Sequence, residues 1–398
     1  PQKQSPDSWA TILGRFGPAG KCRQAVCNGT WHGPGLAAYW RGVIETNERL
    51  EAFLPELRAA QWVAVDTEAD SLHAYPEKIC LIQISLETGD WLVDPLAGMD
   101  LPKLLAVLQD RELLMHGADY DLRLFWKHYR FSPRRVFDTM LAAELLGYRQ
   151  FSLNALVDRY LGITLDKGMQ KADWAKRPLT ERMKAYARND TRHLKRLADK
   201  LRGELQEKGR LAWHEEFCAW QIRDCANQTE PDENTVWRMK GSHQLSRPAL
   251  AVLRELWHWR EKEAIATNRP PFFILPHETL TRLAQAAVDA ELVDLLLPRR
   301  FSNRRREGVH RALRRGLTLP DHQHPELIRT PTRRLTEAER RRLADLERRR
   351  DAQAARLGLN PALIAPRATL RDLARNWDKY APELMQWQRE LLQAPVSS

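Results

Sequence analysis

The amino-acid sequence predicts an α/β domain with a mixed, helix-flanked sheet, followed by two all-α helical modules. Three observations support this prediction. Short apolar runs alternate with amphipathic helices from about residue 43 to residue 208, a polar, Pro-containing segment follows at 228–234, and the helical remainder repeats itself. Alternation of strands and helices is typical of α/β domains rather than of bundles or sandwiches. At 398 residues the chain is long enough for two or three domains.

In the first domain the predicted strands are short apolar runs bounded by turn-like residues, at 43–45, 62–66, 79–85, 91–93 and 113–115. We expect the second, third and fourth runs to pair as an antiparallel meander, because only short turn-like segments separate them. Helices are expected at 47–57 and 104–108. The rest of the domain to about residue 208 is predicted to be largely helical, with a loop near 166–170.

The C-terminal part contains an internal repeat. Sliding the segment that begins at Leu253 by 90 residues aligns it with the segment that begins at Leu343. The identical pairs include Leu256 and Leu346, Arg260 and Arg350, Pro271 and Pro361, Pro276 and Pro366, and Leu280 and Leu370. Such a repeat indicates two related helical modules in tandem. The predicted domain limits are 1–38 for an N-terminal extension without assigned function, 39–227 for the α/β domain, and 237–316 and 333–398 for the modules.

Positive charge is concentrated in the C-terminal part. Residues 238–398 hold 31 of the 63 Lys and Arg residues but only 19 of the 52 acidic residues, so the rest of the chain is close to neutral. A polyanionic partner is one interpretation, because phosphate contacts by Lys and Arg supply sequence-independent affinity. A solvated helical surface that keeps the protein in solution is the other, and charge alone does not decide between them.

The cysteine pattern and the hydropathy exclude several other classes of protein. The five cysteines lack the paired CxxC spacing of a zinc site or disulfide framework. No apolar run approaches the roughly 18 residues of a membrane span. We therefore expect a cytoplasmic protein without membrane attachment.

The first candidate functional residues are Asp66 and Glu68, which follow an apolar strand. A side-chain period of two places both carboxylates on the same side of that strand. About 7 acid-x-acid pairs are expected by chance in a chain with this acidic content, and most such pairs are ordinary surface charge. The pair therefore needs support from elsewhere in the sequence.

Asp190 provides this support. The sequence predicts one helix from about residue 180 to residue 205, and Asp190 falls on its apolar stripe. A buried carboxylate needs a cation, hydrogen-bond donors or a raised pKa, although a salt bridge or a solvent-exposed stretch of helix would also explain it. Tyr186 lies one helical turn earlier on nearly the same face, where a hydroxyl could orient or deprotonate an attacking water.

A third acidic segment follows the predicted strand at 113–115. Asp121 begins a helix there, and either Asp121 or the neighbouring Asp119 could serve as the helix cap. His116, at the end of the strand, is a candidate substrate contact, with a buried structural histidine as the alternative. Four carboxylates from three segments are suited to Mg²⁺ or Mn²⁺ rather than zinc. Two such ions support in-line displacement at a phosphodiester, which is nuclease chemistry.

These segments resemble the three exonuclease motifs of ribonuclease D: 66–68 (DTE), 116–122 (HGADYDL) and 186–190 (YARND). The tandem modules similarly resemble the HRDC domains that follow the nuclease in bacterial members of that family. The resemblance implies a ribonuclease H-like fold and the tyrosine variant of the DEDD exonucleases. It also implies hydrolytic 3′-to-5′ removal of nucleotides from tRNA and other structured RNA.

Carried over residue by residue, the resemblance implies that Asp66, Glu68, Asp121 and Asp190 bind two divalent ions, and that Tyr186 positions the attacking water. It selects Asp121 over Asp119. Lys167 and Gln170, in the loop before the third motif, are candidate substrate contacts, with simple solvation as the alternative. The expected partner is RNA, bound by a monomer.

Two other functions remain open from the sequence. A 3′-to-5′ DNA exonuclease would use the same metal chemistry, because that chemistry is indifferent to the sugar. A non-catalytic RNA-binding protein on an exonuclease fold would need only the basic modules, although the complete set of four carboxylates with Tyr186 argues against it.

Overall fold

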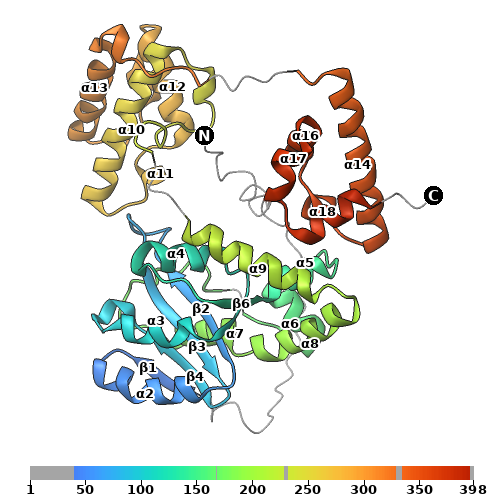
Figure 1. Cartoon of the computed structure of the whole chain (residues 1–398). Helices are drawn as coiled ribbons and strands as arrows, with labels where there is room; N and C mark the ends of the chain where they lie inside the picture. Colours follow the sequence, from blue (N-terminus) through green and yellow to red (C-terminus); the bar gives the residue numbers. More distant parts are fainter. Residues whose placement is uncertain (1–39, 167, 228–231, 329–333, 395–398) are drawn as a thin grey trace, which may run out of the picture.

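The computed structural model describes residues 40–166, 168–227, 232–328 and 334–394. Figure 1 shows an α/β domain in the lower half and two separate helical modules above it. The predicted N-terminal extension, 1–38, lies outside the described residues, as does part of the polar segment at 228–234. None of the described helices is both long and apolar enough to cross a membrane.

The α/β domain is built on a six-stranded mixed sheet with the order β1-β4-β3-β2-β5-β6. The strands are β1 (Trp40–Ile44), β2 (Val63–Ala69), β3 (Ile79–Leu86), β4 (Gly89–Val93), β5 (Glu112–Met115) and β6 (Arg135–Asp138). Strands β2, β3 and β4 pair antiparallel, which confirms the predicted meander, whereas β1, β5 and β6 join the sheet in parallel. Strand β6 was not predicted, because it is only four residues long and contains two apolar residues.

Helices cover both faces of the sheet. They are α2 (Asn47–Ala59), α3 (Leu101–Gln109), α4 (Asp119–Tyr129), α5 (Thr139–Leu145), α6 (Leu153–Leu161), α7 (Glu181–Thr191), α8 (Leu194–Glu207) and α9 (Leu211–Ala226). Val63 and Val65 of β2 pack in the core formed with α2, α3 and α4. Ala64 between them packs on the opposite face with α5 and α8. The even-numbered side chains of β2 therefore face the second layer of helices.

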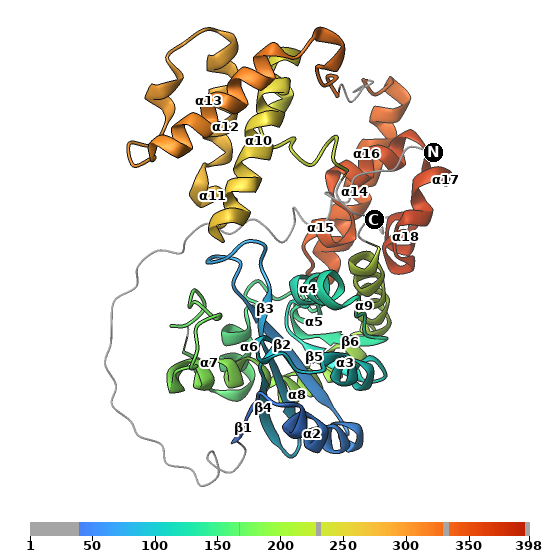
Figure 2. The ribbon, with the colours of Figure 1, turned by 90° about the vertical axis from the view of Figure 1, so that its left-hand side faces the viewer.

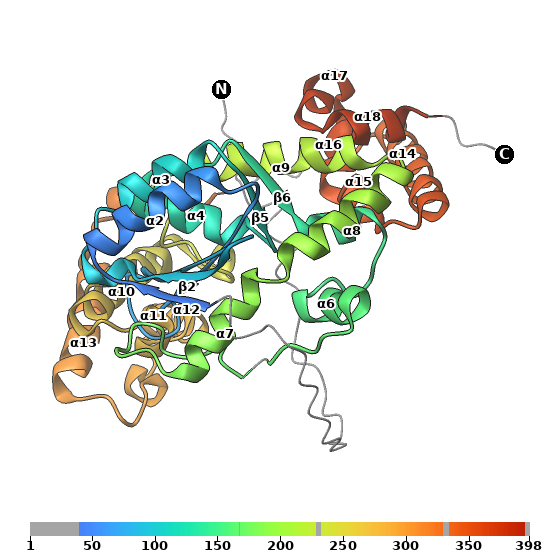
Figure 3. The ribbon, with the colours of Figure 1, turned by 90° about the horizontal axis from the view of Figure 1, so that it is seen from below.

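The prediction of a single helix from about residue 180 to residue 205 is wrong. The chain forms two helices there, α7 and α8, joined by a turn at Arg192 and His193 (Figure 3). Thr180 caps α7 by accepting a hydrogen bond from the Met183 amide at 3.2 Å. Asp190 thus belongs to α7, which packs against β2, β3 and β4, while the leucines of the predicted stripe from Leu194 onward belong to α8.

The first three helices of the two modules begin 90 residues apart, as the internal repeat predicts. The first module contains α10 (Arg247–Thr267), α11 (Pro271–Ile274), α12 (His277–Val288) and α13 (Asn303–Thr318). The second contains α14 (Glu337–Leu357), α15 (Pro361–Ile364), α16 (Arg367–Arg375), α17 (Trp377–Tyr380) and α18 (Gln386–Gln393).

One buried contact is repeated in both modules. Arg260 donates to the Leu275 carbonyl at 3.3 Å, and Arg350 donates to the Ala365 carbonyl at 3.2 Å. The donors and the acceptors are each 90 residues apart. The two modules are therefore related in structure as well as in sequence.

The second module packs directly on the α/β domain (Figure 2). The Arg210 guanidinium donates to the Leu145 carbonyl at 2.6 Å and to the Leu357 carbonyl at 2.8 Å, so it joins α5 to the end of α14. The rings of Trp213 and Trp387 stack with centroids 5.0 Å apart. The first module meets the domain at the β2–β3 loop, where the Tyr75 amide donates to the Asn268 side chain at 3.2 Å.

Candidate active site

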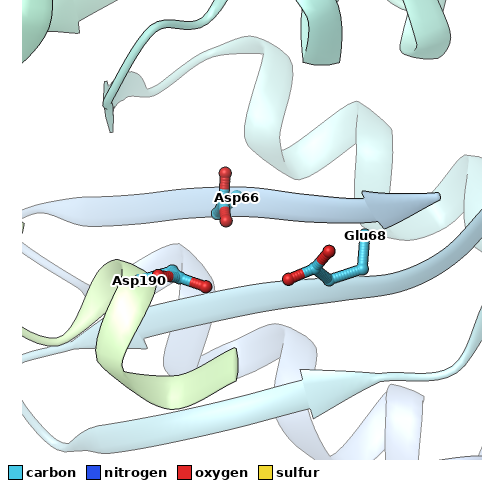
Figure 4. Close-up of side chains that lie close together, drawn as sticks. All are labelled: Asp66, Glu68 and Asp190. Carbon is cyan, nitrogen blue, oxygen red and sulfur yellow. The ribbon is translucent and has the colours of Figure 1, made fainter. Parts of the chain in front are cut away.

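Strand β2 presents Asp66 and Glu68 to the same side of the sheet. Both are even-numbered, like Ala64, so both face the layer that contains α7 (Figure 4). Helix α7 brings Asp190 opposite them, because its buried residues Met183 and Ala187 anchor it against the sheet. One carboxylate oxygen from each of Asp66, Glu68 and Asp190 lies within 4.8 Å of the others.

Asp121 reaches the same region from the start of α4, although it is not part of the 4.8 Å group. Its side chain is buried and accepts a hydrogen bond from the Thr67 hydroxyl. Asp119 instead forms a bidentate pair with Arg123, with both N···O distances 2.9 Å. The structure therefore separates the two aspartates, one within the carboxylate cluster and one in an ion pair.

Neither aspartate caps α4, which corrects the interpretation that one of them does. The N-cap position is Ala118, and it has no side-chain cap. The Asp138 carboxylate instead accepts hydrogen bonds from the amides of Gly117 at 2.9 Å and Ala118 at 2.8 Å. Asp138 comes from the end of β6, the strand that was not predicted.

Burial raises the pKa values of all four clustered carboxyls, and nearby carboxylate charges add to this effect. Burial raises the pKa of Asp66 well above its usual range, and the neighbouring carboxylates raise it further. Burial, with Asp190 and Asp121 nearby, raises the pKa of Glu68 to about 9. Burial raises the pKa of Asp121 to about 7, against the lowering effect of the Thr67 hydrogen bond. The pKa of Asp190 rises to about 7 through burial and the Asp121 charge.

The cluster fits divalent cations. Among the described residues, no Lys or Arg forms an ion pair with any of the four carboxylates, so their charges are uncompensated by protein groups. Hard, anionic oxygen ligands in this number are what Mg²⁺ and Mn²⁺ take in proteins. Bound cations would reverse the effect of burial and keep the carboxyls ionised.

Tyr186 lies one turn before Asp190 on α7 and lines the same cavity. Its ring packs near Trp174, with centroids 6.0 Å apart. Burial raises the pKa of its hydroxyl, and the nearby Asp190 and Glu68 charges raise it further. The hydroxyl therefore stays protonated at neutral pH.

Two of the three predicted substrate contacts line the cavity. The imidazole Nδ1 of His116 lies 2.9 Å from the Thr139 hydroxyl, and burial lowers the pKa of His116 to about 4, so the ring is neutral at pH 7. Gln170 also lines the cavity. Lys167 lies outside the described residues.

The cavity around the carboxylates has a volume of about 1160 Å³. Part of its wall comes from the loop between α5 and α6 and from the start of α6, including Arg149, Phe151 and Asn154. Sequence reasoning missed these residues. No local motif marks them, because they reach the cavity only through the packing of α5 and α6 against the rest of the domain.

A mixed α/β sheet with half-buried carboxylates clustered on its second strand and a facing helix defines a metal-dependent nuclease. Residues 42–206 match the family described as 3′-5′ exonuclease, and residues 249–291 match the HRDC domain. The chain is 33% identical to the ribonuclease D of Gluconacetobacter diazotrophicus over 291 residues, covering 71% of this chain and 74% of that protein. It is 30% identical to the ribonuclease D of Acidiphilium cryptum, covering 88% of this chain and 90% of that one.

The fold is also similar to the crystal structure of Escherichia coli RNase D, with a TM-score of 0.69 and 24% identity. This likeness covers 89% of this chain and 98% of that chain. The chain belongs to the ribonuclease D family. It is a metal-dependent 3′-to-5′ exoribonuclease.

Proposed function

We propose that this protein trims the 3′ ends of tRNA precursors and other structured RNA, with two divalent ions, Mg²⁺ or Mn²⁺, held by Asp66, Glu68, Asp121 and Asp190. The observation that carries the proposal is the group of half-buried carboxylates on β2 and α7, with buried Asp121 beside it, to which no Lys or Arg of the described residues is paired. Such a group is costly unless cations compensate it. The E. coli protein of similar fold is described as an exoribonuclease involved in structured RNA processing.

The bound ions would supply charge stabilisation to the attacking water and to the leaving 3′ oxygen of the scissile phosphodiester. In this proposal Tyr186 orients the water through its hydroxyl, as in the tyrosine variant of the family. Gln170, which lines the same cavity, contacts the substrate. Neutral His116 contacts the terminal nucleotide as a hydrogen-bonding group rather than as a cation, and Lys167 contacts its phosphate.

We assign both helical modules to the HRDC class, with the domain limits 39–227, 237–316 and 333–398. In this proposal they bind the body of the RNA while the α/β domain receives its 3′ terminus. The 90-residue spacing of their first three helices and the repeated Arg260 and Arg350 contacts support the assignment of the second module. The basic surplus beyond residue 238 favours a polyanion as the partner. We further propose that the protein acts as a cytoplasmic monomer.

Replacement of Asp66 tests the catalytic proposal. Asp66→Asn should abolish Mg²⁺-dependent release of nucleoside monophosphates while retaining RNA binding. Asp119→Asn is the matched control, because Asp119 is paired with Arg123 and lies outside the cluster. Undiminished turnover in Asp66→Asn, measured by chromatography of the released nucleotides, would refute the assignment.

Whether the enzyme prefers RNA or DNA as its substrate needs a separate measurement. RNA and DNA oligonucleotides of the same sequence should be degraded in parallel, with the RNA lost faster. Equal or faster loss of the DNA would favour a DNA exonuclease instead.

A further inference from the structure

A second cavity, of about 620 Å³, lies between the α/β domain and the second helical module. The end of α5 and the loop after it form one wall, and the end of α14 with the start of α15 forms the other. Arg149 and Phe151 line both this cavity and the cavity around the carboxylates. The two cavities therefore meet at these two side chains. We call the second cavity the interdomain crevice.

The crevice is bounded by tight contacts rather than by a loose gap. A Cβ added at Gly147 would lie 2.3 Å from the Gly358 carbonyl oxygen, so the backbones of the domain and the module approach closely there. The bond from Arg210 to the Leu357 carbonyl and the stacking of Trp213 on Trp387 hold the same interface. The module wall of the crevice is therefore set in a defined position.

Arg149 at the junction is exposed. It forms no hydrogen bond or ion pair with another residue of the described ranges, whereas its neighbour Arg159 lies over the Tyr148 ring at 4.3 Å. A guanidinium that no described residue pairs with, at the meeting point of two cavities, is suited to a phosphate, which it contacts by two parallel hydrogen bonds.

Phe151 supplies the second element of a nucleotide site. Its ring is half-buried and lines both cavities, so a flat ligand in the crevice would lie against it. Aromatic side chains bind the bases of single-stranded nucleic acids by stacking, without requiring a particular sequence. The crevice volume also lies within the range of sites for small ligands, about 300 to 1,000 Å³.

Glu144 is the one acidic side chain that lines the crevice in the described ranges. Burial raises the pKa of its carboxyl to about 7, and the Asp138 charge adds to this effect. Near neutral pH the group is therefore partly protonated and repels a phosphate less than an ordinary glutamate would. In its protonated form it can donate a hydrogen bond to a base.

The scissile bond joins the last two nucleotides of the RNA strand. We propose that the interdomain crevice binds the nucleotides that lie 5′ of these two. Arg149 contacts the backbone phosphate at the entrance, Phe151 stacks on a base, and Ala355 belongs to the opposite wall on the module. The proposal rests on the exoribonuclease function above and deepens it. It makes the second module part of the substrate path rather than a distant RNA tether.

A series of 5′-labelled oligoribonucleotides of two to eight nucleotides tests the proposal with the full-length protein and Mn²⁺. For the unmodified protein, kcat/KM should rise between the dinucleotide and substrates of about four nucleotides. Ala355→Phe places a bulky ring in the crevice from the module side. It should lower kcat/KM for the longer substrates roughly tenfold and so remove most of that rise. The kcat/KM for the dinucleotide should stay within about twofold of that of the unmodified protein. Ala355→Ser is the matched control, because it keeps the size of the side chain.

Arg149→Ala should likewise lower the ratio of kcat/KM for the longer substrates to that for the dinucleotide. Arg149→Lys should restore part of it, because it keeps the charge without the planar fork. Arg134→Ala serves as the distant control, since Arg134 is exposed and paired with Asp110. The proposal would be overturned if kcat/KM for the unmodified protein did not depend on substrate length. It would also be overturned if the length dependence persisted in both Ala355→Phe and Arg149→Ala. Failure of the unmodified protein to release nucleotides from any RNA would instead refute the proposed function.

Discussion

The Thr67 hydroxyl is hydrogen-bonded to the Asp121 carboxylate, which ties the start of α4 to the strand that carries Asp66 and Glu68. This contact is possible because β5 pairs with β2 only as far as Ala64, so the edge of β2 beyond that point is free. Asp121 approaches the cluster across this free edge. The hydrogen bond therefore fixes the one cluster carboxylate that lies outside the 4.8 Å group.

We predict that Thr67→Val lowers kcat about tenfold, because the buried Asp121 loses its hydrogen bond and its fixed position, an effect of about 1 to 3 kcal/mol. The half-saturating Mn²⁺ concentration should rise in the same variant, which a purely structural role of Thr67 would not cause. Thr67→Ser keeps the hydroxyl and should restore both values. Similar metal titrations for the Val and Ser variants would contradict this role.

The raised pKa values of the cluster predict how the stability of the metal-free protein depends on pH. An unfolded chain ionises these carboxyls near pH 4, whereas in the folded protein the pKa values are about 7 for Asp121 and Asp190 and about 9 for Glu68. The unfolded state therefore binds fewer protons across this range, and stability falls as pH rises from about 4 to about 9.

Thermal melting in EDTA between pH 5 and pH 9 measures this effect. The melting temperature should fall with pH, and excess Mn²⁺ should restore it most strongly at the alkaline end. Asp190→Asn removes one of the interacting charges and should flatten the curve. A metal-free melting temperature that stays constant over this range would contradict the electrostatic account.

Gly147 allows the second module to approach the α/β domain. It has φ +88°, and a Cβ there would lie 2.3 Å from the Gly358 carbonyl oxygen. Gly147→Ala should therefore loosen the module, which small-angle scattering and limited proteolysis would detect. Gly162→Ala is a matched control, because Gly162 has φ +66° but nothing within 4 Å of an added Cβ. The control should show only backbone strain, about 1 to 2 kcal/mol. Equal behaviour of the two variants would show that the close approach is unimportant.

The sequence predicted the elements with strong local patterns and missed those that depend on tertiary packing. Strands β2 to β5 are apolar runs bounded by turns, so they were found, and the internal repeat predicted two related helical modules. The turn between α7 and α8 was missed, because Arg192 and His193 include neither Pro nor Gly and the apolar period of the sequence continues through them.

The residues of the candidate site were likewise predicted only in part from the sequence. Period two along β2 predicted that Asp66 and Glu68 share a side, and the structure has them together with Asp190. The choice between Asp119 and Asp121 could not be made from local pattern, because both lie in the first turn of one helix. The surroundings of Arg149 and Phe151 could not be predicted for a similar reason, because they depend on the packing of α5 and α6 and on the docking of a module roughly 200 residues later in the chain.

The basic surface of the first module should contribute to RNA affinity through α13. Arg311 and Arg314 are exposed there, and neither is ion-paired with another residue of the described segments, whereas Arg315 is bonded to Glu255 at 3.0 Å. Each phosphate contact that is lost should lower the slope of log affinity against log salt by about 0.7 for a single-stranded RNA. Arg311→Gln combined with Arg314→Gln should therefore lower the slope measurably while leaving dinucleotide cleavage intact.

Point substitutions test this surface better than deletion of the modules. Deletion would expose the apolar interface at Trp213 and Trp387 and destabilise the α/β domain itself. Affinities should be measured by fluorescence anisotropy at several salt concentrations, with Asp66→Asn in every protein to prevent degradation. Arg134→Gln, on the α/β domain, is the control for loss of an exposed arginine that has a protein partner. An unchanged slope in the double variant would assign the positive charge of α13 to solvation rather than to RNA binding.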